Sequence, residues 1–192
     1  MKTERSLVWP VLACLFTALI IMGATFAKIP IPWTLVEIYL ANFFVILAAL
    51  LLGPIWGTAS VLLYILLGIL GLPIFSRGAS GLAAIAGPTG GFILGYIPMV
   101  LAMGIIGRIG KRSWWILLIA AVVGELILFG IGVPWFKAVF RTKDAHEAVS
   151  WSKALILSCY PFLPGDALKV AIAVPVARRL GPWLEDVIGK RK

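Results

Sequence analysis

One acidic and one basic residue stand close together inside the last long apolar segment of the chain. The stretch from Tyr160 to Lys169 reads Tyr-Pro-Phe-Leu-Pro-Gly-Asp-Ala-Leu-Lys. Asp166 and Lys169 are three residues apart, so in a helix running on from Pro164 they project from one face. Ionisable side chains inside a membrane segment are costly, and they usually face a bundle interior or a water-filled cavity on a ligand or ion path. The pair predicts a ligand site, and the alternative is a structural ion pair that holds this helix to its neighbours.

The helix that carries this pair is expected to begin near Pro161, Pro164 and Gly165. Prolines are tolerated in the first turn of a helix, where the missing N–H has no partner in any case. A carboxylate near that start is favoured by the positive end of the helix dipole.

The composition is that of an integral membrane protein. The chain has 192 residues, of which 61% are hydrophobic and 13% charged, and its mean hydropathy is +1.05. Crossing a bilayer core takes about 20 apolar residues, so a chain of this length holds roughly six spans and no soluble catalytic domain. The sequence contains no nucleophile elbow, metal-ligand cluster or pair of histidines. We therefore expect neither an enzyme nor a metal or cofactor site.

Six transmembrane helices are predicted within one membrane domain, 1–192, at about 7–27, 37–53, 55–70, 91–107, 114–132 and 161–180. The Gly53-Pro54 break predicts a close antiparallel hairpin of the second and third spans. The first apolar run is long enough to span and has no clear small-residue cleavage site, so no cleaved signal peptide is expected. The fold class is an all-α membrane bundle.

Basic residues set the expected orientation. With a cytoplasmic amino terminus, the inner side holds ten Lys and Arg and the outer side six, and Lys169 completes the seventeen. This bias favours both termini in the cytoplasm. The net charge of +9 lies mostly at segment ends, which fits membrane topology and not nucleic-acid binding. The 28–36, 71–90 and 133–160 connections then lie outside, above Asp166 and Lys169, and outline an outward-facing pocket.

The Gly87-Pro88-Thr89-Gly90-Gly91 stretch looks like a phosphate loop but lacks the Lys-Ser/Thr ending, so no nucleotide site is predicted. It offers the hydroxyl of Thr89 and, from Gly90, free backbone N–H groups at the start of the fourth span. Tyr96, further along that span, has a ring that can bound a ligand and a hydroxyl that can donate to it. The alternative is a tight turn and a packed tyrosine.

Several single residues and residue pairs outside these stretches also carry expectations. Glu125, alone in the fifth span, either carries a coupling proton or pairs with a base such as Lys169. Cys14 and Cys159 are expected to be small core residues, and the sole histidine, His146, to be solvated.

Small residues spaced four apart let helix backbones approach, within one protein or against a partner. Such pairs are Ala13 and Thr17, Cys14 and Ala18, Gly53 and Gly57, and Gly91 and Gly95. A short surface helix is expected over 149–160, and a basic interfacial helix over 182–192.

Three stretches together resemble the signature motifs of BioY, the biotin-binding S component of energy-coupling factor (ECF) vitamin transporters. They are Gly71-Leu72-Pro73-Ile74-Phe75, Gly87-Pro88-Thr89-Gly90-Gly91-Phe92, and Pro161-Phe162-Leu163-Pro164-Gly165-Asp166-Ala167-Leu168-Lys169. The resemblance runs from about residue 8 to 182. It implies an ECF S-component-like bundle in the bacterial cytoplasmic membrane that binds biotin near its outer face. An EcfT subunit and two ATPases would drive uptake, so ATP would act only through these partners.

The same resemblance implies roles for single residues. Asp166 and Lys169 match the charged pair that contacts biotin, since a carboxylate can accept from the ureido N–H groups and an ammonium suits either the ureido carbonyl or the valerate. Phe75, Tyr96 and Trp135 would enclose the apolar parts of the ligand. Ala13 and Thr17 look like the docking surface of the family on the first helix.

Two departures from the family pattern affect the expected ligand contacts. Ser76-Arg77 follow Phe75 where the family often has Ala-Gly, so Arg77 is either an added clamp for a carboxylate or a solvated charge. Glu37–Ala41 replaces a frequent Pro-x-Thr-x-Gln, so the first lid is expected to close differently. Two other functions remain open: a self-sufficient proton-coupled transporter of biotin or a related small carboxylate, and a structural membrane subunit in which the polar pair only orients helices.

Overall fold

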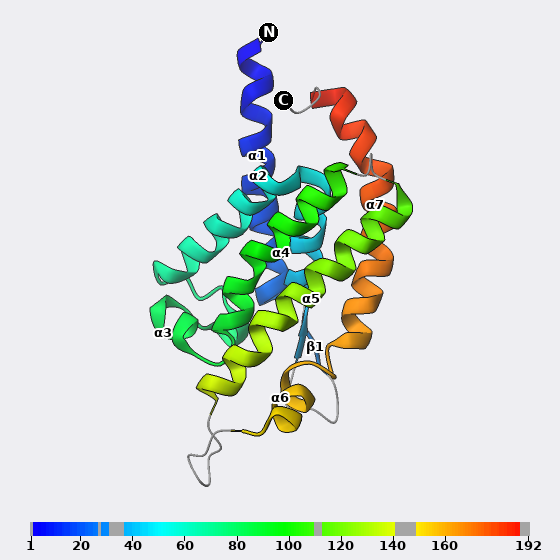
Figure 1. Ribbon diagram of the computed structural model, residues 1–192. Helices are drawn as coiled ribbons and strands as arrows, with labels where there is room; N and C mark the ends of the chain where they lie inside the picture. The colour runs from blue at the N-terminus through cyan, green and yellow to red at the C-terminus, as the bar shows by residue number, and fades with distance from the viewer. Residues whose placement is uncertain (1, 27, 31–36, 110–112, 141–148, 189–192) are drawn as a thin grey trace.

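The computed structural model describes residues 2–26, 28–30, 37–109, 113–140 and 149–188. Long helices form a bundle (Figure 1), and one small hairpin of strands accompanies them. The helices are α1 (Lys2–Thr25), α2 (Ala41–Ile69), α3 (Gly81–Ala86), α4 (Gly90–Ile109), α5 (Trp114–Val139), α6 (Trp151–Ser158) and α7 (Leu163–Ile188). Strands β1 (Lys28–Pro30) and β2 (Glu37–Tyr39) pair antiparallel, and a 3-10 turn, η1, covers Ser76–Gly78. The predicted all-α architecture is confirmed.

Helix α2 reverses direction at Gly53. This residue has φ 74° and ψ −170°, a conformation that only glycine adopts readily, and Pro54 then supplies no N–H to continue the helix. A Cβ on Gly57 would lie 2.9 Å from the carbonyl oxygen of Ala48, whereas nine residues of straight helix would separate the two by roughly 13 Å. The two arms of α2 therefore fold back on each other (Figure 1), as the Gly-Pro break predicts.

Four helices in the described part of the chain are long and apolar enough to cross a membrane: the Leu7–Thr25 part of α1, α2, α4 and α5. Helices α6 and α7, which meet at a bend of 47°, make a fifth candidate if they are counted as one broken span. The chain is therefore a multi-pass membrane protein. Helix α2 lies at its centre, because 72% of its apolar window is buried inside the bundle against 39% for α1, α4 and α5.

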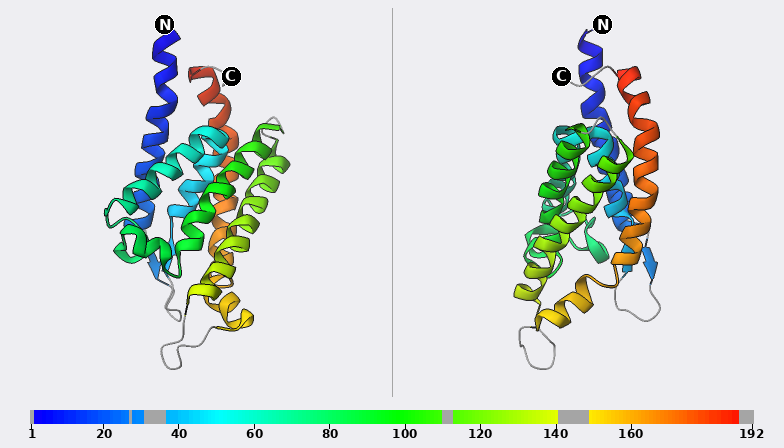
Figure 2. Two further views of the ribbon diagram at one scale, coloured as in Figure 1. Left: turned by 60° about the vertical axis from the view of Figure 1, so that its left-hand side comes forward. Right: turned by 45° about the vertical axis from the view of Figure 1, so that its right-hand side comes forward.

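The start of α1 and the end of α7 lie at the same end of the bundle, while the β1–β2 hairpin, α3 and α6 lie at the opposite end (Figure 2). The hairpin and the two short helices thus gather at one end. Phe75 and Ile74 in the connection after α2 are buried, so part of that connection folds back into the protein.

Two helix boundaries differ from the prediction. Helix α5 continues to Val139, beyond the expected end at 132, because Val133 and Phe136 pack with Val149 and hold this extra turn in place despite Pro134. Helix α7 runs through Pro182 to Ile188, so the described part of the expected tail helix continues α7. The short helix expected over 149–160 is confirmed as α6, and the side chain of Ser150 caps it by accepting a hydrogen bond from the N–H of Lys153.

Candidate functional site

The Asp166 and Lys169 side chains form a buried ion pair. Lys169 Nζ lies 2.8 Å from Asp166 Oδ1, and each residue is 6% exposed. Helix α7 begins at Leu163, which places Asp166 in its first turn, and the backbone N–H of Asp166 donates to the carbonyl of Phe162 over 2.8 Å. The three-residue spacing therefore brings the two charges together on one face, as the sequence predicts.

Two further polar side chains from other helices join this pair. The amide nitrogen of Asn42, the second residue of α2, donates to Asp166 Oδ1 over 3.2 Å and to Glu125 Oε1 of α5 over 2.8 Å. Asn42 is 6% exposed. We call Asn42, Glu125, Asp166 and Lys169 the polar cluster. It links α2, α5 and α7, and it places two carboxylates and one ammonium in the interior of the bundle.

Glu125 does not pair directly with Lys169. Among the described residues the one ion pair of Lys169 is with Asp166, and Glu125 reaches that pair through the Asn42 amide. The expected pairing of Glu125 with a base such as Lys169 is thus not direct, and the Asn42 amide bridges Glu125 to Asp166 in its place. Sequence reasoning missed Asn42, although an asparagine at the head of a strongly apolar run, next to the atypical Glu37–Ala41 stretch, is a visible signal.

The aromatic residues that are expected to enclose a ligand differ in their burial and contacts. Tyr96 on α4 is partly buried and packs against the core, within electrostatic range of Asp166 and Glu125. Phe75 is 0% exposed, and its ring packs edge to face on Tyr64, with centroids 5.5 Å apart. Phe75 is thus fully enclosed in the core, whereas Tyr96 is only partly buried against it.

Trp135 connects α5 to the turn before α4. Its indole Nε1 donates to the carbonyl of Gly87 over 3.0 Å, and a Cβ on Gly91 would clash with the Cβ of Trp135. Thr89 in this turn is exposed, while Gly90 is buried. Trp135 therefore holds the glycine-rich turn against α5.

Ser76 and Arg77 lie in η1, away from the buried interior. Ser76 is partly buried and Arg77 exposed. Arg77 has φ 60°, and its backbone N–H donates to the hydroxyl of Tyr39 over 3.2 Å. This contact ties the loop after α2 to the β1–β2 hairpin, so the two departures from the family pattern lie next to each other.

Ala13 and Thr17, which are expected to dock a partner, lie on the side of α1 that faces α2. These residues are 5% and 3% exposed, and the Thr17 hydroxyl donates to the carbonyls of Ala13 and Ser60, both at 2.9 Å. They pack α1 against α2 in this structure, and their role in docking a partner stays a prediction. The neighbouring small pair, Cys14 and Ala18, is exposed. A core position is therefore wrong for Cys14, whereas Cys159 is buried as predicted; His146 lies outside the described residues.

The polar cluster is suited to binding through hydrogen bonds and charge. In the described part of the chain no group of three or more His, Cys, Asp or Glu side chains is arranged to hold a metal ion. The first turns of α2 and α7 supply Asn42 and Asp166, which places these two residues toward the end where β1–β2 and α6 gather (Figure 1).

Known proteins resemble this chain over nearly its whole length. The model of the BioY family matches residues 1–186. A probable biotin transporter BioY of Pyrococcus horikoshii is 38% identical over 88% of this chain and 93% of its own length, and the biotin transporter BioY of Thermotoga maritima is 36% identical over 88% and 92%. The crystal structure of the S-component for biotin from an ECF-type ABC transporter superposes with a TM-score of 0.79 at 28% identity, covering 94% of each chain. The chain belongs to the BioY family.

Proposed function

We propose that this protein is the biotin-binding subunit of a vitamin uptake transporter, which captures biotin and delivers it inward with an ATP-driven ECF module. The buried Asp166–Lys169 pair carries the proposal, because a bundle that only crosses a membrane has no need of charges in its interior. The similarity to biotin transporters over most of the chain supports biotin as the ligand. The family consists of transporter components, so no catalysis by this chain is proposed.

The proposed topology has six spans and cytoplasmic termini. The two arms of α2 would cross separately, because the chain reverses at Gly53, and α7 would complete the set. The end that carries β1–β2, α3 and α6 would face outward, so biotin would reach the polar cluster from outside. The EcfT subunit would dock on α1 through exposed positions such as Cys14 and Ala18, where small side chains permit close helix contact.

A second candidate is a self-sufficient proton-coupled transporter of biotin or a related small carboxylate. One observation favours it: Glu125 Oε2 is buried and has no hydrogen-bond partner, and a carboxyl group in such a place can exchange a proton. Uptake that persists without ATPase subunits and stops when the proton gradient is collapsed would support this function. Uptake that requires the ATPases would exclude it.

The test is equilibrium binding of biotin to detergent-purified protein, with Asp166→Asn and Lys169→Met beside the wild type. Loss of one charge-assisted contact should weaken binding by roughly ten- to a hundredfold. Asp186→Asn is the matched control, since Asp186 is an exposed carboxylate of the same helix and should leave binding unchanged. A folded wild type that ignores biotin would refute the proposed ligand, and Arg77 and the Glu37–Ala41 stretch would then be the places to search for another one.

A further inference from the structure

Helix α7 carries two adjacent arginines, Arg178 and Arg179, near the end of the bundle where both chain termini lie (Figure 2). Both residues are exposed. In the described part of the chain, no carboxylate lies within ion-pair distance of either guanidinium group. A charged side chain on a membrane-spanning helix is costly unless it finds a partner or reaches the headgroup region. Both guanidinium groups are thus free to bind a partner from outside the chain.

Arg179 lies at the end of an apolar stripe on α7. Leu168, Ile172, Arg179 and Trp183 follow one another at intervals of four, seven and four residues, which places them on one side of the helix. Leu168 and Ile172 are 63% and 47% exposed, whereas Ala177 on the opposite side is fully buried in the core. An exposed apolar stripe on a membrane-spanning helix contacts lipid tails. The stripe therefore leads along the lipid to Arg179.

The length of this stripe matches one leaflet of a bilayer. At 1.5 Å per residue, Leu168 lies about 16 Å from Arg179 along the helix axis. Half of a typical hydrocarbon core is about 15 Å. A lipid whose tails lie along Leu168 and Ile172 would thus have its phosphate near the level of Arg179.

Two exposed tryptophans mark the same level. Trp183 follows Arg179 by one turn, about 6 Å along the axis, and it is 60% exposed. Trp115, the second residue of α5, is 69% exposed, and α5 begins at the end of the bundle where the chain termini lie (Figure 2). Tryptophans of membrane proteins are enriched at the headgroup level. The two arginines therefore lie at the inner edge of the headgroup region, where lipid phosphates are found.

The chemistry of the two side chains favours a phosphate in direct contact. A guanidinium group binds phosphate oxygens through two parallel N–H donors. Glu185 and Asp186 lie seven residues beyond Arg178 and Arg179 in the described turns of α7, about 10 Å further along the axis. They balance the two positive charges at this end of α7, so a broad positive field does not account for lipid binding here. A headgroup with a net negative charge is favoured over a zwitterionic one, because two arginines repel the cation of the latter.

We propose that Arg178 and Arg179 form a binding site for the phosphate of an anionic phospholipid, in the leaflet at the end of the bundle that carries the chain termini. Trp183 lies beside the headgroup, and the acyl chains run along Ile172 and Leu168. This inference goes beyond the proposed function and does not depend on it, since it needs only a bundle that crosses a membrane.

The test places full-length protein in lipid vesicles and measures how strongly lipids with brominated acyl chains quench tryptophan fluorescence. Bromine quenches only the indoles that the lipid contacts. Measuring each variant with and without Trp183→Phe isolates the signal of Trp183 from the other tryptophans, of which the chain has eight in all. At Trp183, phosphatidylglycerol should be preferred over phosphatidylcholine by about fivefold for each of the two arginines.

Three variants identify the origin of this preference. Arg178→Gln/Arg179→Gln should lower it to about one. Arg178→Lys/Arg179→Lys keeps both charges but loses the planar pair of donors, so it should lose most of the preference. Lys153→Gln removes an exposed cation on α6, at the opposite end of the bundle, and is the control that should keep the preference of the wild type. All three should unfold near the temperature of the wild type in detergent, because the replaced side chains are exposed.

Four outcomes would overturn the inference. The first is equal quenching of Trp183 by both lipids in the wild type. The second is an unchanged preference in Arg178→Gln/Arg179→Gln, and the third is a full preference in Arg178→Lys/Arg179→Lys, since charge alone would then explain the binding. The fourth is a wild type without lipid preference whose Arg178→Gln/Arg179→Gln variant fails in biotin uptake, which would assign the arginines to a protein partner. Biotin affinity should stay the same in all three variants, so failure of the proposed ligand is measured separately.

Discussion

The Asp166–Lys169 pair allows a quantitative test of how the bundle tolerates charge. Both side chains are almost fully buried and lie 2.8 Å apart. Removing one partner of a buried pair typically costs about 3–5 kcal/mol, because the remaining charge stays in the interior without compensation. We therefore expect Lys169→Met to be strongly destabilised, since it leaves Asp166 and Glu125 sharing only the Asn42 amide.

The double variant separates the charge from the packing. In Asp166→Asn/Lys169→Met no charge is left unpaired at these two positions, so its cost should be smaller than that of Lys169→Met by roughly 1–3 kcal/mol. An interaction energy of this size between two residues in direct contact can be measured with a double-mutant cycle. The double variant should thus recover stability without recovering biotin binding.

Unfolding in detergent, followed by the fluorescence of the eight tryptophans, measures these differences. At about 2–4 °C per kcal/mol for a chain of this size, Lys169→Met should unfold on the order of 10 °C below wild type. Asp186→Asn, at an exposed position, should stay within about 0.5 kcal/mol. Additive costs, with the double variant as unstable as the sum of the single variants, would refute the reasoning that the two charges compensate each other.

Three smaller changes test the packing that positions the site. Gly57→Ala places a methyl group against a backbone carbonyl at 2.9 Å and should lower stability by about 1–3 kcal/mol, whereas Gly130→Ala, with nothing within 4 Å, should be neutral or stabilising in thermal unfolding. Thr17→Val removes a hydroxyl that bridges two helices and should cost about 1 kcal/mol without changing biotin affinity; a loss of binding by the folded variant would contradict a purely structural role. Trp135→Phe keeps the ring and loses the bond to the glycine-rich turn, so amide hydrogen exchange in that turn should become faster, and unchanged exchange would show that the bond does not hold it.

The sequence was sufficient to predict the features that depend on local spacing. The reversal at Gly53 follows from a glycine–proline pair, and the meeting of Asp166 and Lys169 follows from the helical period. Each of these features needs only a few neighbouring residues to be specified.

Features that depend on how helices turn toward one another were not predictable. Ala13 and Cys14 are adjacent small residues on α1, and only the packing of α2 decides that one is buried and the other exposed. Asn42 joins Glu125 and Asp166 across separations of 83 and 124 residues, which no local pattern encodes. The contacts of Phe136 with the segment before α6 likewise lengthen α5 beyond its expected end at 132.

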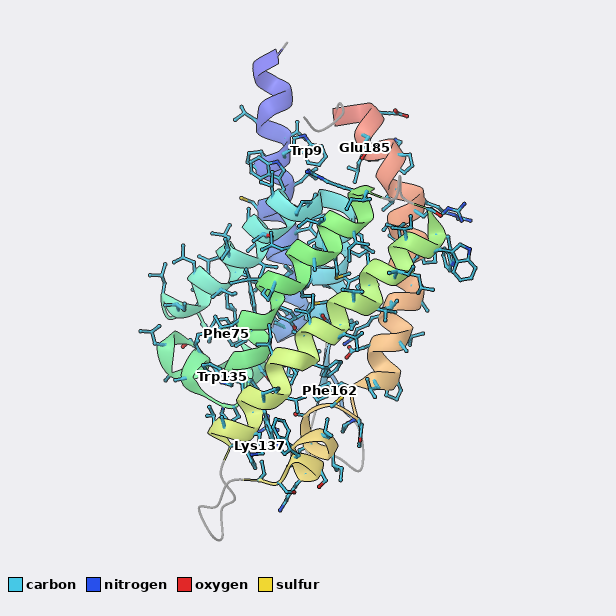
Figure 3. The ribbon with its side chains drawn as sticks, in the orientation of Figure 1. Trp9, Phe75, Trp135, Lys137, Phe162 and Glu185 are labelled. Atoms are coloured by element: carbon cyan, nitrogen blue, oxygen red, sulfur yellow. The ribbon has the colours of Figure 1, made fainter. Side chains whose placement is uncertain are left out.

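The position of the two chain ends has a practical consequence. Trp9 near the start of α1 and Glu185 near the end of α7 lie at one end of the bundle, while Lys137 and Phe162 lie at the other (Figure 3). A fluorescent reporter, an affinity handle or a bead can therefore be attached through both termini at once, and all such attachments lie on the side away from the first turn of α7. Immobilised in this way, the protein keeps the end that carries β1–β2, α3 and α6 free in a single uniform orientation, which suits it to surface-based measurement of biotin binding.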